Sequence, residues 1–153
     1  DAMITPKAER HVSTSRVIAA PAQEIFEILA DPAKHSIIDG SGSLVEAKGN
    51  PPQLFLGAKF GMKMSFHATM RNKVVEFEDG KQIGWRHIGQ HVWRYELENV
   101  EGGTKVTETF DWRPSPLPWL LQRQDIPTKN LASMEKTLER LDTYVTTGNV
   151  PES

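Results

Sequence analysis

The feature that most constrains the fold of this chain is a long series of β-strand segments followed by one amphipathic helix. Candidate strands lie at 44–47, 58–67, 68–78, 82–88, 92–98 and 104–113. The breaks between them are short and carry turn residues, as in Asp79-Gly80 and Glu101-Gly102-Gly103. Strands joined by such short turns pair antiparallel, so the pattern predicts a meander and not a set of βαβ units.

The predicted helix covers residues 128–145. Its apolar residues recur at spacings of three and four, which places them in one stripe: Leu131, Met134, Leu138, Leu141 and Val145. Charged side chains such as Glu135 and Lys136 cover the other side. Such a stripe must be buried against another element, so we expect a curved antiparallel sheet packed on this helix, in an α+β fold.

The N-terminal segment supplies one more strand and two short helices. Residues 11–18 are rich in β-branched residues and Ser, which predicts a strand. Pro21 suits a first helical position, and an apolar helical pattern follows at 23–30. Asp31-Pro32 is expected to end that helix and to cap a second one at 33–39.

Composition excludes several classes of protein. The 153 residues indicate one domain, and a net charge of -2 argues against a nucleic-acid binder that neutralises phosphates. The absence of cysteine excludes disulfides, Fe–S clusters, thiolate zinc and a cysteine nucleophile. No apolar run is long enough for a transmembrane segment, and with no export signal we expect the cytoplasm.

The register of the last hairpin predicts an acidic residue on an aromatic face. If residues 100–103 form the loop, the pairs run as follows: Asn99 with Thr104, Leu97 with Val106, Tyr95 with Glu108, Trp93 with Phe110, and His91 with Trp112. Three of these pairs are apolar or aromatic, as expected for a buried face. Glu108 then lies beside Tyr95, although a slip of one residue would turn it outward.

The preceding hairpin requires a loop with an odd number of residues. A two-residue turn at Gly89-Gln90 would leave Trp85 and His87 on the wrong face. A three-residue loop at 89–91 pairs His87 with Trp93 and Trp85 with Tyr95, and it places His91 in the loop at the rim of the sheet.

Several segments resemble the START-like helix-grip superfamily, also called SRPBCC, and within it the polyketide cyclase/dehydrase-type branch. They are Ile18-Ala19-Ala20-Pro21-Ala22-Gln23-Glu24-Ile25-Phe26, Leu29-Ala30-Asp31-Pro32, Ile38-Asp39-Gly40-Ser41-Gly42, Trp93-Arg94-Tyr95-Glu96-Leu97 and Gly102-Gly103-Thr104-Lys105-Val106-Thr107. The resemblance extends from about Arg10 to Val145. The first two segments are fairly specific for the superfamily, whereas the strand segments are weaker.

The resemblance implies a seven-stranded antiparallel sheet wrapped around the C-terminal helix, with the two short helices between the first two strands. It also implies a deep apolar cavity that takes lipids, sterols, quinones, polyketides or hormones. The expected domain is 10–147, with flexible termini at 1–9 and 148–153. Because the superfamily has no universal catalytic motif, it implies a pocket and not a reaction.

The residues expected to bind a hydrophobic ligand come from the helices and the inward faces of the strands. They are Phe26, Met62, Met64, Phe66, Trp85, Trp93, Tyr95, Phe110, Leu131, Met134 and Leu138. Methionine adapts to irregular apolar ligands, although the same side chains would equally fill a solid core.

Three polar residues are candidates for catalysis. Tyr95 and Glu108 would form a hydrogen-bonded pair inside the pocket, where burial raises the pKa of a carboxyl group and suits it to acid/base chemistry. His87 would supply a base near neutral pH. The competing interpretation, which is favoured for both residues, is a solvated Glu108 in a different register and a half-buried His87 bonded to the backbone.

Three further groups of residues are open to a functional and a structural interpretation. His35 and Asp39 either mark the pocket mouth or serve as cap and exposed polar residues, and the second interpretation is favoured. His67, His87, His91 and Glu108 lack metal-ligand spacing, so no metal and no cofactor are expected. The apolar residues in 114–127 form a flap over the pocket, a contact for a partner or membrane, or a stiff connection.

We therefore expect a single-domain protein that binds a hydrophobic or amphipathic small molecule, such as a lipid, polyketide or quinone, in a central cavity. The first alternative is a polyketide aromatase/cyclase or dehydratase that uses the polar cavity residues. The second is a protein-interaction module with a filled cavity and an exposed apolar area around Trp119. The ligand, any reaction and the oligomeric state stay open at this point.

Overall fold

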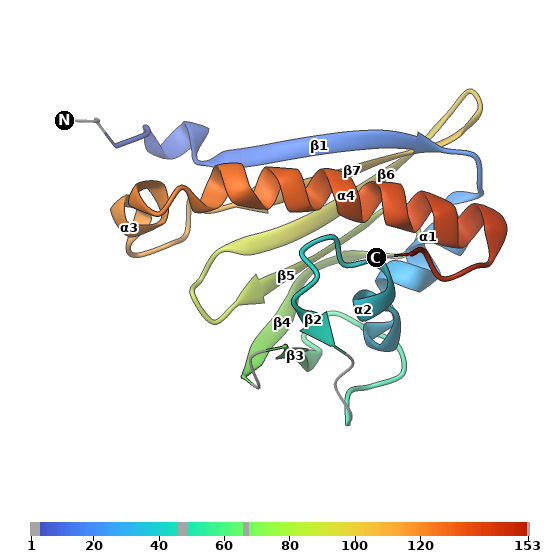
Figure 1. Ribbon diagram of the computed structural model, residues 1–153, viewed down its shortest axis with the longest axis horizontal. Coiled ribbons are helices and arrows are strands. Elements are labelled where there is room, and N and C mark those ends of the chain that lie inside the picture. The colour runs from blue at the N-terminus through green and yellow to red at the C-terminus, as the bar shows by residue number, and fades with distance from the viewer. Residues whose placement is uncertain (1–3, 46–48, 66–67, 153) are drawn as a thin grey trace.

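The computed structural model describes residues 4–45, 49–65 and 68–152 (Figure 1). Its single described sheet has seven antiparallel strands in the order β1-β7-β6-β5-β4-β3-β2. They are β1 (His11–Ile18), β2 (Leu44–Val45), β3 (Lys59–Met64), β4 (Thr69–Glu78), β5 (Gln82–His87), β6 (Val92–Val100) and β7 (Gly103–Asp111). The helices are η1 (Lys7–Glu9), α1 (Ala22–Leu29), η2 (Pro32–Lys34), α2 (His35–Ile38), α3 (Pro118–Arg123) and α4 (Ile126–Thr147).

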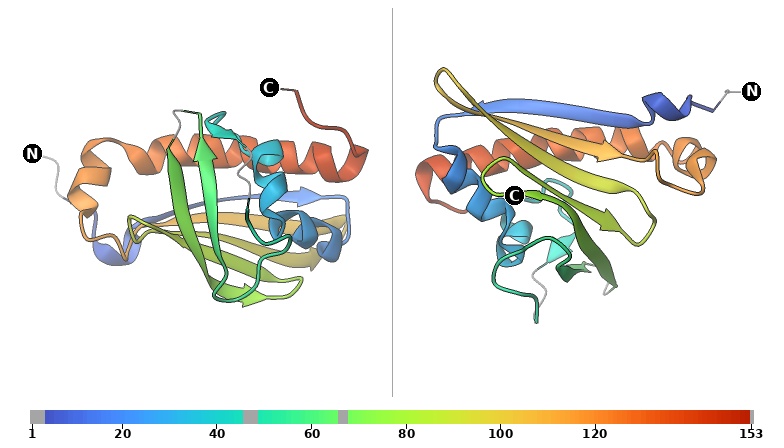
Figure 2. Two further views of the ribbon diagram at one scale, coloured as in Figure 1. Left: turned by 90° about the horizontal axis from the view of Figure 1, so that it is seen from below. Right: turned by 180° about the vertical axis from the view of Figure 1, so that it is seen from behind.

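The sheet is strongly curved, and α4 lies on its concave side. In Figure 1, α4 runs along β1 and in front of β7 and β6. Figure 2 shows β3 and β4 turned steeply across the direction of α4, with α1 and α2 beside them. The predicted α+β fold, a seven-stranded sheet around a long C-terminal helix with short helices between its first two strands, is confirmed.

Helix α4 is longer than predicted at both ends. It begins at Ile126, because Pro127 is tolerated in a first turn, where its missing N–H leaves no hydrogen bond unmade. It ends before Gly148, whose φ of 74° is a left-handed conformation that glycine adopts without steric cost. Its fully buried residues are Met134, Thr137, Leu138 and Leu141. Among the helices of the described residues, none combines the length and the apolar character of a membrane span.

The two short helices differ from the prediction in detail. Pro21 is the N-cap of α1 and not its first helical residue. The helix expected at 33–39 is a 3₁₀ turn followed by the four residues of α2. The predicted cap is present, because the Asp31 carboxylate accepts a hydrogen bond of 3.0 Å from the Ala33 N–H.

The β6–β7 register agrees with the prediction. Asn99 pairs with Thr104, Leu97 with Val106, Tyr95 with Glu108, and Trp93 with Phe110. The ladder also includes Val100 opposite Gly103, so the turn is tighter than expected. At its other end the ladder stops at Val92 and Asp111, so the expected pair of His91 and Trp112 lies beyond it.

The predicted β5–β6 register is wrong, because the three-residue loop begins one residue earlier than expected. Trp85 pairs with Trp93, and the His87 N–H donates to the His91 carbonyl at 2.9 Å. The loop is therefore residues 88–90, closed by Gln90 in a left-handed conformation with a φ of 73°. Because the loop still has an odd number of residues, Trp85 and His87 remain on the aromatic face, and His91 joins them there.

Candidate functional site

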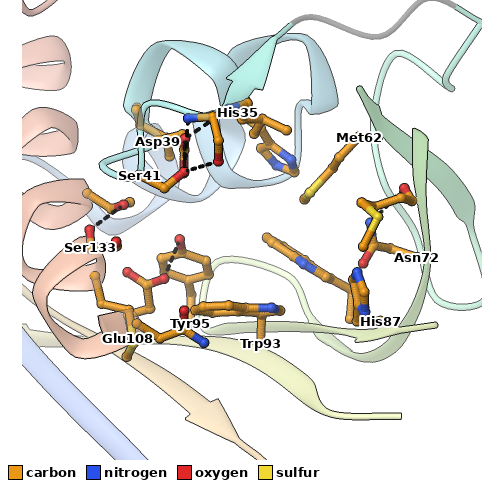
Figure 3. Close-up of a pocket in the computed structure, with 18 of the residues that line it drawn as sticks. His35, Asp39, Ser41, Met62, Asn72, His87, Trp93, Tyr95, Glu108 and Ser133 are labelled. Atoms are coloured by element: carbon orange, nitrogen blue, oxygen red, sulfur yellow. Dashed lines mark hydrogen bonds between the residues drawn. The ribbon is translucent and has the colours of Figure 1, made fainter. Parts of the chain in front are cut away.

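A cavity of about 310 Å³ lies between the concave face of the sheet, α2 and α4 (Figure 3). Its apolar lining consists of Leu29, Ile38, Leu44, Met62, Met64, Met70, Trp85, Trp93, Ile126 and Met134. Its polar lining consists of His35, Asp39, Ser41, Ser43, Asn72, His87, His91, Tyr95, Glu108, Asn130, Ser133 and Thr137. This volume is at the lower end of the range for small-molecule sites, about 300–1,000 Å³.

Most of the residues expected at a pocket lie around this cavity. The expected residues in its lining are Met62, Met64, Trp85, Trp93, Tyr95, Met134, His87 and Glu108. They come together because alternate residues of β3, β5, β6 and β7 point to the concave face.

Four expected residues lie elsewhere. Phe26 packs edge-on against Phe77 at 5.5 Å, and Leu138 is buried in the main apolar core. Phe110 lies behind Trp93, at 4.9 Å between ring centroids, and Leu131 is half-buried on α4 outside the lining. Because α4 packs closely on β1 and β7, Leu138 and Phe110 are enclosed by other core side chains. Phe66 is outside the described residues.

Glu108 and Tyr95 form the chemically distinctive pair of the cavity. The Tyr95 hydroxyl donates to Oε2 of Glu108 at 3.0 Å, and Glu108 is only 3 % exposed. Burial raises the pKa of Glu108 to about 8; Asp39 adds to the increase and the Tyr95 hydrogen bond opposes it. Glu108 is therefore mostly protonated at neutral pH. Its Oε1 atom has no hydrogen-bond partner within the described residues.

Burial also keeps the Tyr95 hydroxyl protonated. Desolvation, followed by the charge of Glu108, raises the pKa of Tyr95 well above its usual value. The hydroxyl thus remains a donor across the ordinary pH range, and it holds the Glu108 carboxyl in one orientation.

His35 lies in the interior of the protein, which contradicts the favoured view of it as a cap or exposed residue. Its ring stacks on Trp85 at 5.0 Å, and Nε2 is 2.8 Å from the Leu29 carbonyl oxygen. Burial lowers the pKa of His35, so the ring is neutral. If Nε2 carries the proton and donates to Leu29, Nδ1 is an acceptor, and it has no partner among the described residues.

Asn72 is a buried polar residue on the opposite side of the cavity. It lies on β4 between Met70 and Val74, whose side chains share its face. Its amide nitrogen makes one long hydrogen bond of 3.4 Å to the Met70 carbonyl, and its amide oxygen has none in the described part of the chain. Figure 3 shows Asn72 and His87 across the cavity from Tyr95 and Glu108.

His87 and His91 form a stacked pair at the turn end of the cavity. Their ring centroids are 4.6 Å apart, and His91 also contacts Phe110 at 5.0 Å. Burial lowers the pKa of both rings, and it lowers the pKa of His91 to about 4, with a smaller contribution from the neighbouring His87. Across the described residues, no group of three or more His, Asp or Glu side chains is arranged to hold a metal ion.

Sequence reasoning missed the polar face of α4. Asn130, Ser133 and Thr137 line the cavity and recur at spacings of three and four, one position away from the apolar stripe. Asn72 was missed as well, although its alternation with Met70 and Val74 was a usable signal.

The segment at 114–127 forms α3 and its flanking turns. Leu121 packs against the cluster of Phe110, Trp112 and Met134, whereas Trp119 is 53 % exposed. Residues 114–125 are not part of the cavity lining. Of the three interpretations of this segment, the structure supports a connection packed on the body, and Ile126 at its end lines the cavity.

Comparison with known proteins gives a family match over almost the whole chain. The model of a family described as polyketide cyclase / dehydrase and lipid transport matches residues 9–146. Uncharacterized protein Rv0088 of Mycobacterium tuberculosis is 39% identical over 108 residues, which cover 66% of this chain and 47% of that protein. The chain thus spans about half the length of the curated relatives it matches.

Solved structures share the fold at low sequence identity. Protein NE0264 from Nitrosomonas europaea has a TM-score of 0.72 and 15% identity, over 92% of this chain and 97% of that one. Protein SSP2350 from Staphylococcus saprophyticus has a TM-score of 0.68 and 20% identity, over 94% and 96%. With the family match and the helix-grip architecture together, the chain belongs to the polyketide cyclase / dehydrase and lipid transport family of the START-like superfamily.

Proposed function

We propose that the protein binds a small, neutral, amphipathic molecule in the cavity between the sheet and α4. The observation that carries this proposal is a cavity with a mostly apolar surface, lined by three residues whose buried polar atoms have no hydrogen-bond partner within the described residues. Buried polar atoms are rarely left unpaired, because each loses its hydrogen bonds to water. A ligand with matching groups would supply the missing bonds.

The three groups specify the pattern of polar atoms on the ligand. Protonated Glu108 offers a donor beside Tyr95, which suits a carbonyl oxygen on the ligand. The Asn72 amide oxygen and His35 Nδ1 are acceptors, which suit ligand hydroxyl groups. The proposed ligand is therefore a compact hydroxylated carbonyl compound, such as a small polyketide or quinone, and not a two-chain lipid.

The first test is mass spectrometry of freshly purified protein under native and denaturing conditions. We expect an excess mass that is lost on denaturation and that corresponds to a molecule small enough for the cavity. A binding series by calorimetry then tests the polar pattern with hydroxytetralone, tetralone and tetralin. Each polar group lost should weaken binding by about 1–3 kcal/mol, or roughly 5-fold to 150-fold. Equal affinity for all three compounds would contradict the proposed anchors.

A second candidate function is proton transfer on the bound carbonyl compound, as in a cyclase or dehydratase. The specific observation in its favour is Glu108, whose pKa of about 8 suits proton exchange near neutral pH beside the donor Tyr95. The test is exchange of the protons next to the tetralone carbonyl for deuterium, followed by NMR. For an enzyme, Glu108→Gln should abolish the exchange and preserve binding, whereas a carrier shows no enhanced exchange.

A further inference from the structure

The outer face of β3, β4 and β5 carries an uncompensated positive charge. An open groove there is lined by five exposed cations: Lys59, Lys63, Arg71, Lys73 and Arg86. These residues alternate along the strands with inward-facing ones, so they lie on the side opposite the cavity. No acidic side chain lines this groove among the described residues.

The strand register places three of these cations in one row. Lys59 is directly opposite Lys73, and Lys73 is directly opposite Arg86. Like charges in directly opposite positions destabilise a sheet. Within residues 4–45, 49–65 and 68–152, none of the five cations forms an ion pair. An anionic partner would relieve this repulsion.

The neighbouring part of the outer face is different, because its charges are paired. Arg94 donates to both carboxylate oxygens of Glu76, at 2.6 and 2.7 Å, and Asp111 accepts from Arg94 and Arg113. The chain as a whole has a net charge of -2. The positive face on β3–β5 is therefore a local feature and not a result of overall composition.

Two further observations connect this face to an apolar environment. Ile88, which is 66 % exposed, lines the same groove at the end of β5. Asn72 and His87, which pair where β4 begins and β5 ends, line both the groove and the cavity, so the two adjoin there. We propose that the five cations and Ile88 dock the protein on an anionic phospholipid bilayer, with the cavity edge at Asn72 and His87 beside the membrane.

The features of the groove favour a bilayer over a nucleic acid. Binding of single strands depends on exposed aromatic rings on which bases stack. The phenyl ring in the groove lining, Phe60, is only 4 % exposed. Clustered Lys and Arg beside an exposed apolar side chain are instead the pattern that anionic membrane surfaces attract.

The test is co-sedimentation of the full chain, without added ligand, with vesicles of phosphatidylcholine alone or mixed with phosphatidylglycerol. We expect binding to the mixed vesicles only, and weaker binding as salt is added. Each cation near an anionic leaflet increases the partition coefficient of the protein onto the vesicles about fivefold. The partition coefficient of the triple variant Lys59→Gln, Lys73→Gln, Arg86→Gln should therefore be roughly hundredfold lower.

The matched control removes three exposed cations of η1 and α4, Lys7→Gln, Lys129→Gln and Lys136→Gln, and thus changes the net charge equally. We expect it to bind as the unchanged protein does. Thermal melting should show that the first triple variant is folded and no less stable, because its substitutions remove repulsion.

Three outcomes would overturn the proposal: equal loss in both triple variants, equal binding to both kinds of vesicle, or tighter binding to duplex DNA than to the mixed vesicles. Since no cavity ligand takes part, this test is independent of the proposed ligand binding.

Discussion

At the scale of single residues, Glu108 is the buried carboxyl group of the cavity whose pKa is raised to about 8. Its carboxyl group lies on an aromatic strand face, and one of its oxygen atoms has no hydrogen-bond partner within the described residues. Burial disfavours the charged form, so the folded state holds a proton that an ordinary carboxyl would release. Folding stability must therefore depend on pH through this residue.

The first prediction concerns the pH dependence of stability. The pKa of Glu108 is about 8 in the folded protein and has an ordinary value of 4.5 in the unfolded chain. Between these values the folded state binds more protons, so the free energy of unfolding falls as pH rises, by up to about 1.4 kcal/mol per pH unit. Urea unfolding across this window should show the decline in the native sequence and a flatter profile in Glu108→Gln.

The control for this prediction is Glu96→Gln on the exposed side of the same hairpin. It should keep the pH profile of the native sequence. If Glu108→Gln kept the pH dependence of the native sequence, another group would be the cause of that dependence.

The second prediction concerns His91, for which the sign is reversed. Its pKa is about 4 in the folded protein against an ordinary value of 6.5, so the unfolded chain binds more protons between these values. The free energy of unfolding should fall as pH decreases through this window. His91→Phe should weaken that dependence, measured by urea unfolding, whereas His11→Phe on exposed β1 should not. Identical profiles for both variants would exclude His91 as the cause.

At the scale of elements, the contact between the segment after α2 and α4 controls the cavity. The Gly40 N–H donates to Thr137 Oγ1 at 2.9 Å. A Cβ atom on Gly40 would lie close to the backbone of Ser133 and Thr137. The absence of a side chain at this position is therefore what allows the segment to close the cavity against α4.

The third prediction follows from this close approach. Gly40→Ala should lower the free energy of unfolding by about 1–3 kcal/mol, because backbone atoms of α4 must shift to accept the methyl group. Chemical denaturation measures this loss. Gly89→Ala, where the three nearest atoms belong to the rings of His91 and His87 and not to the backbone, is the control and should change stability by about 0.5 kcal/mol or less. A similar effect at both positions would contradict the packing argument.

At the scale of the whole molecule, stability is distributed unevenly over the sheet. β6 and β7 have hydrogen-bonded partners on both sides, and α4 packs against β1 and β7. In the described part of the chain, β2 is a two-residue edge strand whose partner is β3. The cavity lies toward the half of the sheet that contains β2 and β3. A bound ligand should therefore stabilise these strands more than it stabilises β6 and β7.

The fourth prediction is a gradient of amide hydrogen exchange. Exchange followed by mass spectrometry should be slowest in β6 and β7 and fastest in β2 and β3, because local opening requires the loss of fewer contacts at the edge. Addition of hydroxytetralone should slow exchange mainly in α2, β3 and β4. Uniform protection across the sheet would contradict the gradient.

The extent to which sequence predicted this protein differs from one element to the next. The β6–β7 register followed from matched apolar and aromatic pairs, and α4 followed from its stripe. The β5–β6 register did not, because nothing in the sequence signals that Gln90 adopts a left-handed conformation. The row of Lys59, Lys73 and Arg86 was also hidden, since it depends on two ladders, one with a register shift between Val74 and Glu76.

The sequence by itself determined the α+β class and the order of the elements. It left open the register that pairs Glu108 with Tyr95, and the favoured interpretation of Glu108 as a solvated residue is wrong. The spacing of apolar residues and the residue types of the turns are local properties of the sequence. They set the side of a helix or strand on which a side chain lies. Only the tertiary structure decided that a cavity separates these residues from α4, and that Phe26 and Leu138 lie outside it. The physical reason is that the curvature of the sheet and the position of α4 set the distance between the sheet and the helix. Both depend on many contacts between residues that are distant in the sequence.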